Sequence, residues 1–337
     1  MTSASVALPS AAASFLEESL GAGAGSVSVE PLAGDASTRR YFRVRNADGS
    51  TQVLALNPEP FDSAALPFLV VHGLLTGYGL PVPRVLAVDG GRGVLLQEDL
   101  GDVSLQRALE SASAEERAGH YREALEQLAR LQREASRGPR DACCFSLAFD
   151  VEKLAWELDF FLTHFVCGLR GARPDEAGLA AIRGGFRALC EEIAGWPRVL
   201  CHRDYHSRNL MLHGGGLWWI DFQDARMGPA TYDLASLLRD SYTPLPEDLV
   251  SELAEAFRRQ ALPREPPDVF RRRLELVSVQ RCLKALGTFG FMTTVRQSPH
   301  YVQYVDRALA NVRRDLLRHP ELDLLRRALG RHIEELG

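Results

Sequence analysis

The sequence lacks the features that mark membrane, secreted and zinc-finger proteins. No apolar run approaches the roughly 20 residues that cross a bilayer. No lysine or arginine precedes Arg39, so the apolar stretch 5–16 lacks the basic start of a secretory signal. The six cysteines form no C-x-x-C pair, which predicts reduced, mostly buried thiols. We therefore expect a soluble, cytoplasmic protein in which the stretch 5–16 is a short amphipathic helix.

An excess of positive charge is also missing. The net charge is −5, whereas a dedicated nucleic-acid binder is usually basic, so a small-molecule ligand is the better expectation. Apolar residues at 46% and charged residues at 25% are ordinary for a globular chain. A length of 337 residues is enough for about two domains of ~150 residues each. We expect a monomer without a nucleic-acid or membrane partner.

The first hundred residues differ in pattern from the rest. Strand-like runs lie at 26–31, 40–46, 52–57 and 93–98, with one helix-like run at 62–75. Long amphipathic helices follow at 114–135 and 151–166, and short apolar runs interrupt the helical part at 198–201, 210–213 and 217–222. We predict an α+β fold of two lobes, with a small β-rich N-lobe over 1–100 that binds nucleotide and a large helical C-lobe over 101–337.

The segment 202–209 holds the residues that point to chemistry. Asp204 and Asn209 lie five residues apart in a predicted loop between strands, and Asp221 follows at the end of a predicted hairpin. Phosphoryl transfer needs a carboxylate at the incoming hydroxyl and hard oxygen ligands that hold Mg²⁺ against the phosphates. Each residue alone is more often a cap or a turn residue, but their order together predicts Asp204 as the catalytic carboxylate and Asn209 and Asp221 as magnesium ligands. We expect His202 to pack under this loop and Asp233 to brace it.

Two stretches of the predicted N-lobe are candidates for nucleotide contact. The loop 34–40 offers hydroxyl and guanidinium groups between two predicted strands, and Arg43 lies on a strand face that can reach the cleft. An ordinary hairpin turn is the alternative for the loop. The run 95–101 ends the predicted N-lobe and resembles a kinase hinge, whose backbone groups would form hydrogen bonds with adenine. A plain interdomain linker is the alternative for this run. The predicted ATP-binding residues are Ser37, Thr38, Arg39, Arg40, Arg43, Gln97, Glu98, Asp99 and Leu100.

With these residues, the sequence resembles the aminoglycoside phosphotransferase and choline kinase superfamily, which has a protein-kinase-like fold. Within it, the chain is most similar to the bacterial anomeric sugar kinases that phosphorylate N-acetylmuramate and N-acetylglucosamine at the 1-hydroxyl. The resemblance runs over most of the chain and is most specific from residue 202 to 240. Its pieces are 34–37, 39–43, 98–102, 202–211, 220–225, 228–229, 231–234, 237–240, 280–281 and 283–287.

The resemblance implies an ATP- and Mg²⁺-dependent kinase that makes a sugar 1-phosphate in cell-wall recycling. Polar residues that follow Asp204 and Asp221 would contact the sugar, and Arg281 or Lys284 would meet the carboxylate of N-acetylmuramate. Solvated helix charges are the alternative for those two residues. The implied substrate-binding residues are Tyr205, His206, Arg208, Gln223, Asp224, Asp240, Arg281 and Lys284.

One departure from the kinase pattern concerns the small lobe. Lysine occurs only at positions 153 and 284, and no glutamate lies between Pro60 and Gln97, so the lysine and glutamate that pair in the small lobe of most kinases are both absent. Arg39, Arg40 or Arg43 would then contact the phosphates. Two alternatives stay open: a kinase of another small alcohol, such as an aminoglycoside or choline, and a nucleotide-binding pseudokinase.

Overall fold

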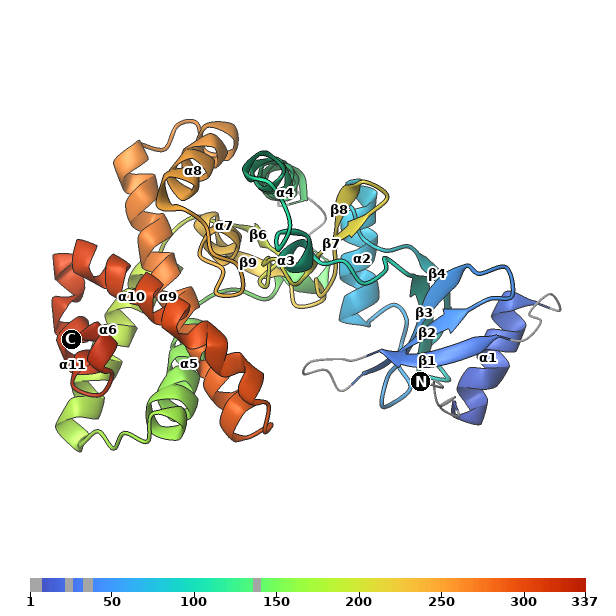
Figure 1. Cartoon of the computed structure of the whole chain (residues 1–337), viewed down its shortest axis with the longest axis horizontal. Coiled ribbons are helices and arrows are strands. Elements are labelled where there is room, and N and C mark those ends of the chain that lie inside the picture. Colours follow the sequence, from blue (N-terminus) through green and yellow to red (C-terminus); the bar gives the residue numbers. More distant parts are fainter. Residues whose placement is uncertain (1–7, 22–26, 33–38, 136–140) are drawn as a thin grey trace. The chain divides into compact units, whose positions relative to one another are not determined.

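The computed structural model describes residues 8–21, 27–32, 39–135 and 141–337, and it divides into two compact units (Figure 1). The first unit comprises Met1–Val103 and Met211–Gln223, and the second comprises Ser104–Leu210 and Asp224–Gly337. A β-rich start followed by a helical remainder confirms the predicted α+β class. The segment Met211–Gln223 groups with the first unit, whereas the sequence analysis places it in the second lobe.

A five-stranded antiparallel sheet forms the body of the first unit, in the order β1-β2-β3-β5-β4. Four of its strands lie within a few residues of the predicted runs. The strand β4 was not predicted, because it is short and follows a stretch with two prolines. The strands are β1 (Ser28–Leu32), β2 (Arg40–Arg45), β3 (Thr51–Leu56), β4 (Val85–Asp89) and β5 (Val94–Glu98).

Helix α1 (Ser10–Leu20) packs on one face of this sheet (Figure 1). It begins after Pro9 and ends at Gly21, whose φ is 72°, so it starts later than the predicted helix over 5–16. The residues that form this core are Ala12, Phe15, Leu16, Phe42, Val44, Leu54, Leu56, Val94 and Leu96. Because side chains alternate along a strand, Arg43 of β2 and its partner Val53 of β3 lie on the opposite face.

The hairpin that follows the predicted catalytic loop, residues 202–209, belongs to the first unit from Met211 onward. It consists of β7 (Leu210–His213) and β8 (Gly216–Trp219), and the N–H of Trp219 donates to the carbonyl of Pro81 at 2.7 Å. Phe222, just after the hairpin, stacks on Phe68 with the ring centroids 5.1 Å apart. Phe68 is buried in α2 (Pro67–Gly77), which starts five residues later than the predicted helix because its Pro67 takes the first helical position.

The second unit is helical and is centred on the 28-residue helix α9 (Figure 1). Its longer helices are α4 (Ala114–Glu134), α5 (Val151–Phe161), α6 (Glu176–Ala194), α7 (Thr231–Leu238), α8 (Glu247–Ala261), α9 (Pro267–Thr294), α10 (Val305–Arg318) and α11 (Asp323–Gly330). The shorter helical segments are α3 (Leu105–Ala108), η2 (Cys143–Phe145), η3 (Leu162–Leu169), η4 (Pro299–Tyr304), η5 (Pro320–Leu322) and η6 (Glu334–Leu336). In the described part of the chain, no helix has both the length and the apolar character to span a bilayer.

Two glycines let α9 approach the helix that runs from α5 into η3. A Cβ atom at Gly287 would lie 2.8 Å from the Cα of Phe161, and one at Gly290 would lie 2.3 Å from the carbonyl oxygen of His164. The sequence predicts one continuous α-helix over 151–166, but the helix changes to π-helical turns at Leu162. The close approach fixes α9, the helix that carries Arg281 and Lys284, against the core of the unit.

The short strand β6 (Arg198–Cys201) leads directly into the catalytic loop. It pairs with β9 (Arg226–Pro229), which was not predicted, while β7 and β8 form a separate two-stranded sheet. The predicted single group of strands is therefore two sheets. Gly228 of β9 has no room for a side chain, because a Cβ there would lie 2.5 Å from the ring of Phe149.

Candidate active site

The loop after β6 is fixed by one buried carboxylate. Asp233, in the first turn of α7, is fully buried and accepts hydrogen bonds from the N–H groups of His202 at 2.6 Å and Arg203 at 2.9 Å. These contacts confirm the predicted bracing role of Asp233. Burial raises the pKa of Asp233 to about 7, against the lowering effect of the two hydrogen bonds. Arg203 has a φ of 87°, a conformation uncommon outside glycine, so the loop needs this support.

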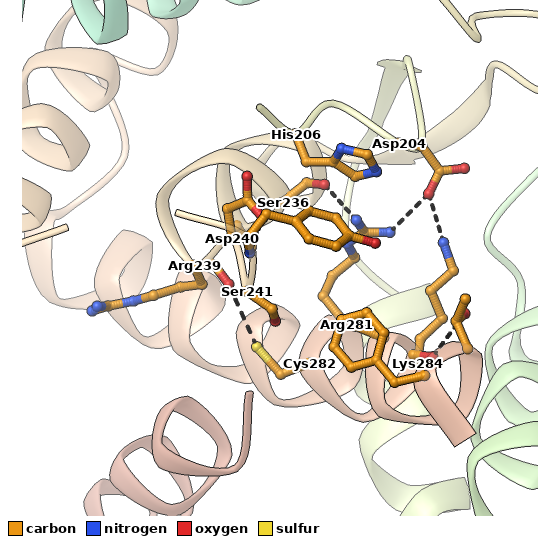
Figure 2. A pocket seen from close by; sticks show the side chains of 14 residues that line it. Asp204, His206, Ser236, Arg239, Asp240, Ser241, Arg281, Cys282 and Lys284 are labelled. Carbon is orange, nitrogen blue, oxygen red and sulfur yellow. Dashed lines mark hydrogen bonds and ion pairs between the residues drawn. The ribbon is translucent and has the colours of Figure 1, made fainter. Parts of the chain in front are cut away.

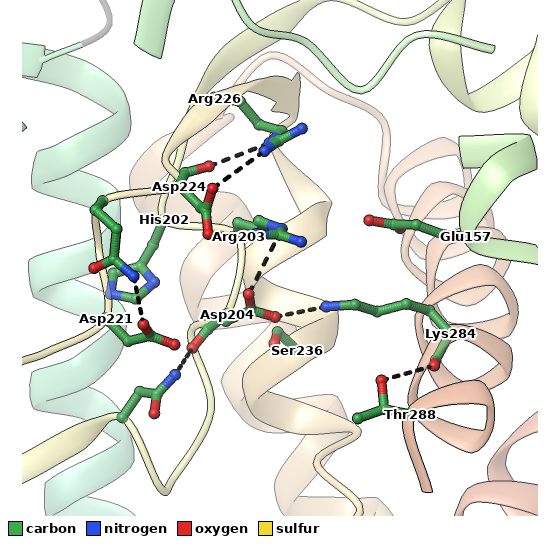
Figure 3. A network of polar contacts seen from close by, with 12 residues as sticks. Glu157, His202, Arg203, Asp204, Asp221, Asp224, Arg226, Ser236, Lys284 and Thr288 are labelled. Carbon is green, nitrogen blue, oxygen red and sulfur yellow. Dashed lines mark hydrogen bonds and ion pairs between the residues drawn. The ribbon is translucent and has the colours of Figure 1, made fainter. Parts of the chain in front are cut away.

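Asp204 lies among three cations of the second unit, of which Arg203 and Lys284 are labelled in Figure 3 and Arg281 in Figure 2. Its Oδ1 atom is 2.6 Å from the Nζ of Lys284 and 3.6 Å from Nη1 of Arg281, and its Oδ2 atom is 3.6 Å from Nε of Arg203. Burial raises the pKa of Asp204, but the charges of Lys284, Arg203 and Arg281 outweigh it and hold the pKa well below its usual range. Asp204 is therefore an ionised carboxylate at neutral pH.

Arg281 is part of the scaffold under the loop. Its guanidinium is 8% exposed and donates to the carbonyl of Arg203 at 3.0 Å, to the hydroxyl of Tyr232 at 3.2 Å and to the hydroxyl of Ser236. The two hydroxyls belong to α7, so Arg281 ties α9 to α7 and to the loop. These contacts favour a supporting role over the predicted role as a partner of the substrate carboxylate.

A pocket of the second unit opens beside Asp204 (Figure 2). It has an empty volume of about 550 Å³, including the part that is open to solvent. Of the predicted substrate-binding residues, it brings together His206, Asp240, Arg281 and Lys284, whereas Tyr205, Arg208 and Asp224 are not in its wall. The full lining is Asp204, His206, Ala235, Ser236, Arg239, Asp240, Ser241, Tyr242, Arg281, Cys282, Lys284, Ala285, Thr288 and Phe289.

Asp240 and Tyr205 use their polar atoms within the fold. Asp240 is 5% exposed, and its carboxylate accepts from the N–H and hydroxyl of Ser207 and from the N–H of Tyr242. Tyr205 is fully buried, and its hydroxyl donates to the carbonyl of Ala124 at 2.8 Å. Both residues were predicted as sugar contacts, and these bonds instead favour roles in holding the catalytic loop.

The other predicted contacts in the loop lie beside aromatic rings. Burial lowers the pKa of His206 to about 3, so its imidazole is neutral, and its ring meets the ring of Tyr242 edge-on at 5.3 Å. The guanidinium of Arg208 lies over the same Tyr242 ring at 4.8 Å and over Tyr301 at 5.8 Å. His202 is 1% exposed and lies edge-on to Tyr205, which confirms its predicted packing role.

The two predicted magnesium ligands, Asn209 and Asp221, belong to different units. Asn209 donates from its Nδ2 to the carbonyl of Asp204 at 3.0 Å, so the bond uses the amide nitrogen and not the oxygen that binds a cation. Asp221 follows β8 with a φ of 64°, and its carboxylate accepts from Gln223 at 2.7 Å. Amide and carboxylate oxygens are the hard donors that Mg²⁺ prefers, so the chemistry of each of these residues suits the ion.

The predicted contact Asp224 pairs with the catalytic loop. Its carboxylate is 2.7 Å from the guanidinium of Arg203 and 3.8 Å from that of Arg226.

Sequence reasoning missed Glu157, a 2% exposed carboxylate that accepts from Gln280 at 3.0 Å and lies 3.6 Å from the Nζ of Lys153. Its position between Leu154 and Leu158 on the apolar face of a predicted helix was the available signal, because a charge there needs partners.

In the first unit, Arg43 is bound by two carboxylates. It contacts Asp99 at 2.6 Å and Asp102 at 2.8 Å, using three nitrogens of its guanidinium. The hydrogen bonds from Asp102 and Asp99 raise the pKa of Arg43. Arg43 therefore ties β2 to the segment after β5, which favours a structural role over the predicted phosphate contact.

The other predicted nucleotide-binding residues in the described part of the first unit contact side chains or strands of that unit. Arg39 donates to Asn57 at 2.8 Å and lies over the ring of Phe68 at 5.7 Å, while Arg40 lies over Phe42 at 5.8 Å. Ser37 and Thr38 lie outside the described residues. In the run 95–101, Gln97 of β5 pairs with β3 and β4, Glu98 of β5 accepts from the N–H and guanidinium of Arg84, and Leu100 is buried.

The sequence profile of the phosphotransferase enzyme family matches residues 28–269. A protein of Pseudomonas aeruginosa named N-acetylmuramate/N-acetylglucosamine kinase is 34% identical over 87% of this chain and 85% of its own length. A protein of Pseudomonas putida with the same name is 33% identical over 92% of this chain and 88% of its own length.

A solved structure confirms the protein-kinase-like fold. The ADP-bound aminoglycoside phosphotransferase APH(2″)-Ib matches with a TM-score of 0.60 and 13% identity, over 90% of this chain and 98% of its own. The family match covers most of the chain, including the catalytic loop and the segment of Asp221. This chain, with its carboxylate, amide and carboxylate in the order of phosphoryl-transfer enzymes, belongs to the phosphotransferase enzyme family.

Proposed function

We propose that this protein transfers the γ-phosphoryl group of ATP to the anomeric hydroxyl of N-acetylmuramate, N-acetylglucosamine or both, and so makes a sugar 1-phosphate in cell-wall recycling. The names of the two Pseudomonas relatives, which align over nearly the whole chain, support these acceptors. The structural observation that carries the proposal is the pocket beside Asp204, because it gives an acceptor a place next to the predicted catalytic carboxylate. We place the reaction in the cytoplasm, where ATP is available.

The environment of Asp204 suits a hemiacetal hydroxyl. A carboxylate surrounded by Lys284, Arg203 and Arg281 is a weak base, so it acts chiefly by orienting the hydroxyl in line with the γ-phosphate. A hemiacetal hydroxyl is more acidic than an ordinary alcohol and needs less help to lose its proton. Within the pocket, His206 offers a polar group to the sugar, and Tyr242 offers a ring surface.

The nucleotide and metal parts of the proposal rest on the fold and on the donor set. The ADP-bound APH(2″)-Ib structure supports ATP as the phosphoryl donor. Asn209 and Asp221 would hold Mg²⁺, which, when bound, neutralises phosphate charge. Among the arginines of the small unit, we propose Arg39 as the phosphate contact. Arg39 lies in the predicted phosphate loop 34–40 and precedes β2, whereas Arg40 is the first residue of β2 and Arg43 is bound by two carboxylates.

Phosphorus NMR with proton coupling tests the proposal directly. The purified protein is incubated with ATP, Mg²⁺ and, separately, N-acetylmuramate, N-acetylglucosamine, choline and an aminoglycoside. We expect a new phosphate signal coupled to the anomeric proton of an amino sugar, and none when EDTA removes the metal. A phosphate on another hydroxyl, or product with choline or the aminoglycoside alone, would contradict the assigned acceptor. Full turnover with EDTA present would remove the metal from the mechanism.

A further inference from the structure

The two oxygens of the Asp204 carboxylate are in different environments. Oδ1 accepts a hydrogen bond from the ammonium of Lys284 at 2.6 Å and faces Arg281 at 3.6 Å. Oδ2 has one charged neighbour in the described residues, Arg203, at 3.6 Å, which is beyond hydrogen-bond distance. The Asp204 side chain is 20% exposed and lines the pocket, so one oxygen is occupied and the other is available to a ligand.

Lys284 is carried by a helix that packs tightly against its neighbour. It lies in the middle of α9, whose close approach to α5 at Gly287 leaves no space for even one added carbon atom. Asp204, in contrast, lies in an irregular loop next to the left-handed Arg203. The direct ion pair between Lys284 and Asp204 therefore holds the carboxylate at a fixed place relative to α9. Figure 3 shows the two side chains meeting end to end.

We infer that Lys284 is a positioning residue for Asp204: it holds Oδ1 and so fixes Oδ2 as the oxygen that receives the acceptor hydroxyl. The inference rests on the proposed phosphotransferase site and deepens it. A hydroxyl must approach with its oxygen aligned toward the phosphorus, and a carboxylate free to rotate would spend much of its time in unproductive orientations. Lys284 removes that freedom with one charge-assisted hydrogen bond.

This role differs in its consequences from recognition of a substrate carboxylate. N-acetylmuramate carries a carboxylate and N-acetylglucosamine does not. If Lys284 bound that group, its loss would raise the KM for N-acetylmuramate and leave N-acetylglucosamine unaffected. If Lys284 positions Asp204, its loss lowers kcat for both sugars by a similar factor and changes KM little, because both hydroxyls depend on the same oxygen.

The test compares Lys284→Met and Lys284→Arg with the wild type, using both sugars at saturating ATP. We expect Lys284→Met to lose about 10²-fold in kcat for each, the scale of a displacement near 1 Å at a reacting group. Lys284→Arg keeps the charge and the donors and should recover part of this loss. Arg187→Met, which removes a cation from an exposed pair with Glu191 on α6, is the matched control and should retain wild-type kinetics.

Three outcomes would overturn the inference: wild-type kcat in Lys284→Met, a loss confined to the KM for N-acetylmuramate, or no gain from the arginine variant when both variants show wild-type thermal unfolding. If the wild type phosphorylates neither sugar, the proposed acceptors are wrong. The role of Lys284 is then read from the slow hydrolysis of ATP, in which water takes the place of the acceptor, and the same 10²-fold fall in Lys284→Met is expected.

Discussion

The two units pair their charges in opposite ways. In the first unit, one cation, Arg43, lies between two carboxylates, Asp99 and Asp102. In the second unit, one carboxylate, Asp204, lies among three cations. The first arrangement neutralises the charge of Arg43, which was predicted to contact phosphate. It also ties β2 to the segment after β5.

The second arrangement keeps a surplus of positive charge at a partly exposed carboxylate. Burying charges costs free energy unless they are well paired, so such a cluster is more typical of a functional site than of a stabilising one. The positive charge of Arg43 in the small unit is therefore used to join two segments, whereas the positive charge of Lys284 in the large unit acts on the predicted catalytic carboxylate.

The largest effect is expected for Asp204→Asn. The amide keeps the shape of the side chain and can still accept from Lys284, but it cannot take the proton of the acceptor hydroxyl. We expect a loss of about 10²–10⁴-fold in kcat, the range for removal of a general base, with little change in the KM for ATP. Steady-state kinetics at several ATP concentrations provides the measurement, and circular dichroism checks the fold. A loss of ATP binding in a folded variant would instead make Asp204 a nucleotide ligand.

A smaller effect is expected when Arg39 is replaced by Ala. A hydrogen bond to a charged group contributes about 1.5–3 kcal/mol, which corresponds to a rise of at least tenfold in the KM for ATP. Arg40→Ala is the matched control, because Arg40 is the next residue, is exposed and lies over Phe42. We expect its kinetics to stay within about twofold of the wild type, as for most surface substitutions. If the control loses affinity and Arg39→Ala does not, the assignment among the arginines is wrong.

The sequence predicts the catalytic loop well because the loop is a local pattern. Asp204 and the packing of His202 follow from residues close together in the chain, and the structure bears out that packing. It also bears out the predicted brace Asp233, although Asp233 lies 31 residues from His202. The boundaries of α4, β6 and β7 are likewise within a residue of the predicted runs, because strong periodicity or short apolar runs between turn residues define them.

Features that depend on distant segments could not be predicted. Lys284 reaches Asp204 from 80 residues away, and only the packing of α9 brings them together. Strand β9 contains Gly228 and Pro229, residues that are poor in strands, and it forms because β6 provides a partner. The π-helical turns after α5 coincide with the glycines of α9, whose effect on backbone distance is not visible in either segment alone.

The smallest effect is expected at the surface partner of Arg43. The side chain of Asp102 is 64% exposed, whereas that of Asp99 is 3% exposed and also accepts from the N–H of Gly101. Water screens the outer pair, so Asp102→Asn should lower the free energy of unfolding by about 0.2–1 kcal/mol. Asp99→Asn, which leaves a buried donor without its charged acceptor, should lower it by about 1–3 kcal/mol. Urea unfolding at pH 7 measures both.

The pH dependence of stability tests the assignment of Asp99. Burial raises the pKa of Asp99, but its bonds to Arg43, Gly101 and Thr51 outweigh burial and lower the pKa below its usual value. A carboxylate whose pKa is lower in the folded chain stabilises the fold above its unfolded pKa of about 3.9, and this contribution is lost as the pH falls through the folded value. The difference in stability between wild type and Asp99→Asn should therefore be constant from pH 7 to 5 and shrink below about pH 4. A difference that grows on acidification would contradict the assignment of Asp99 as the buried, ionised partner of Arg43.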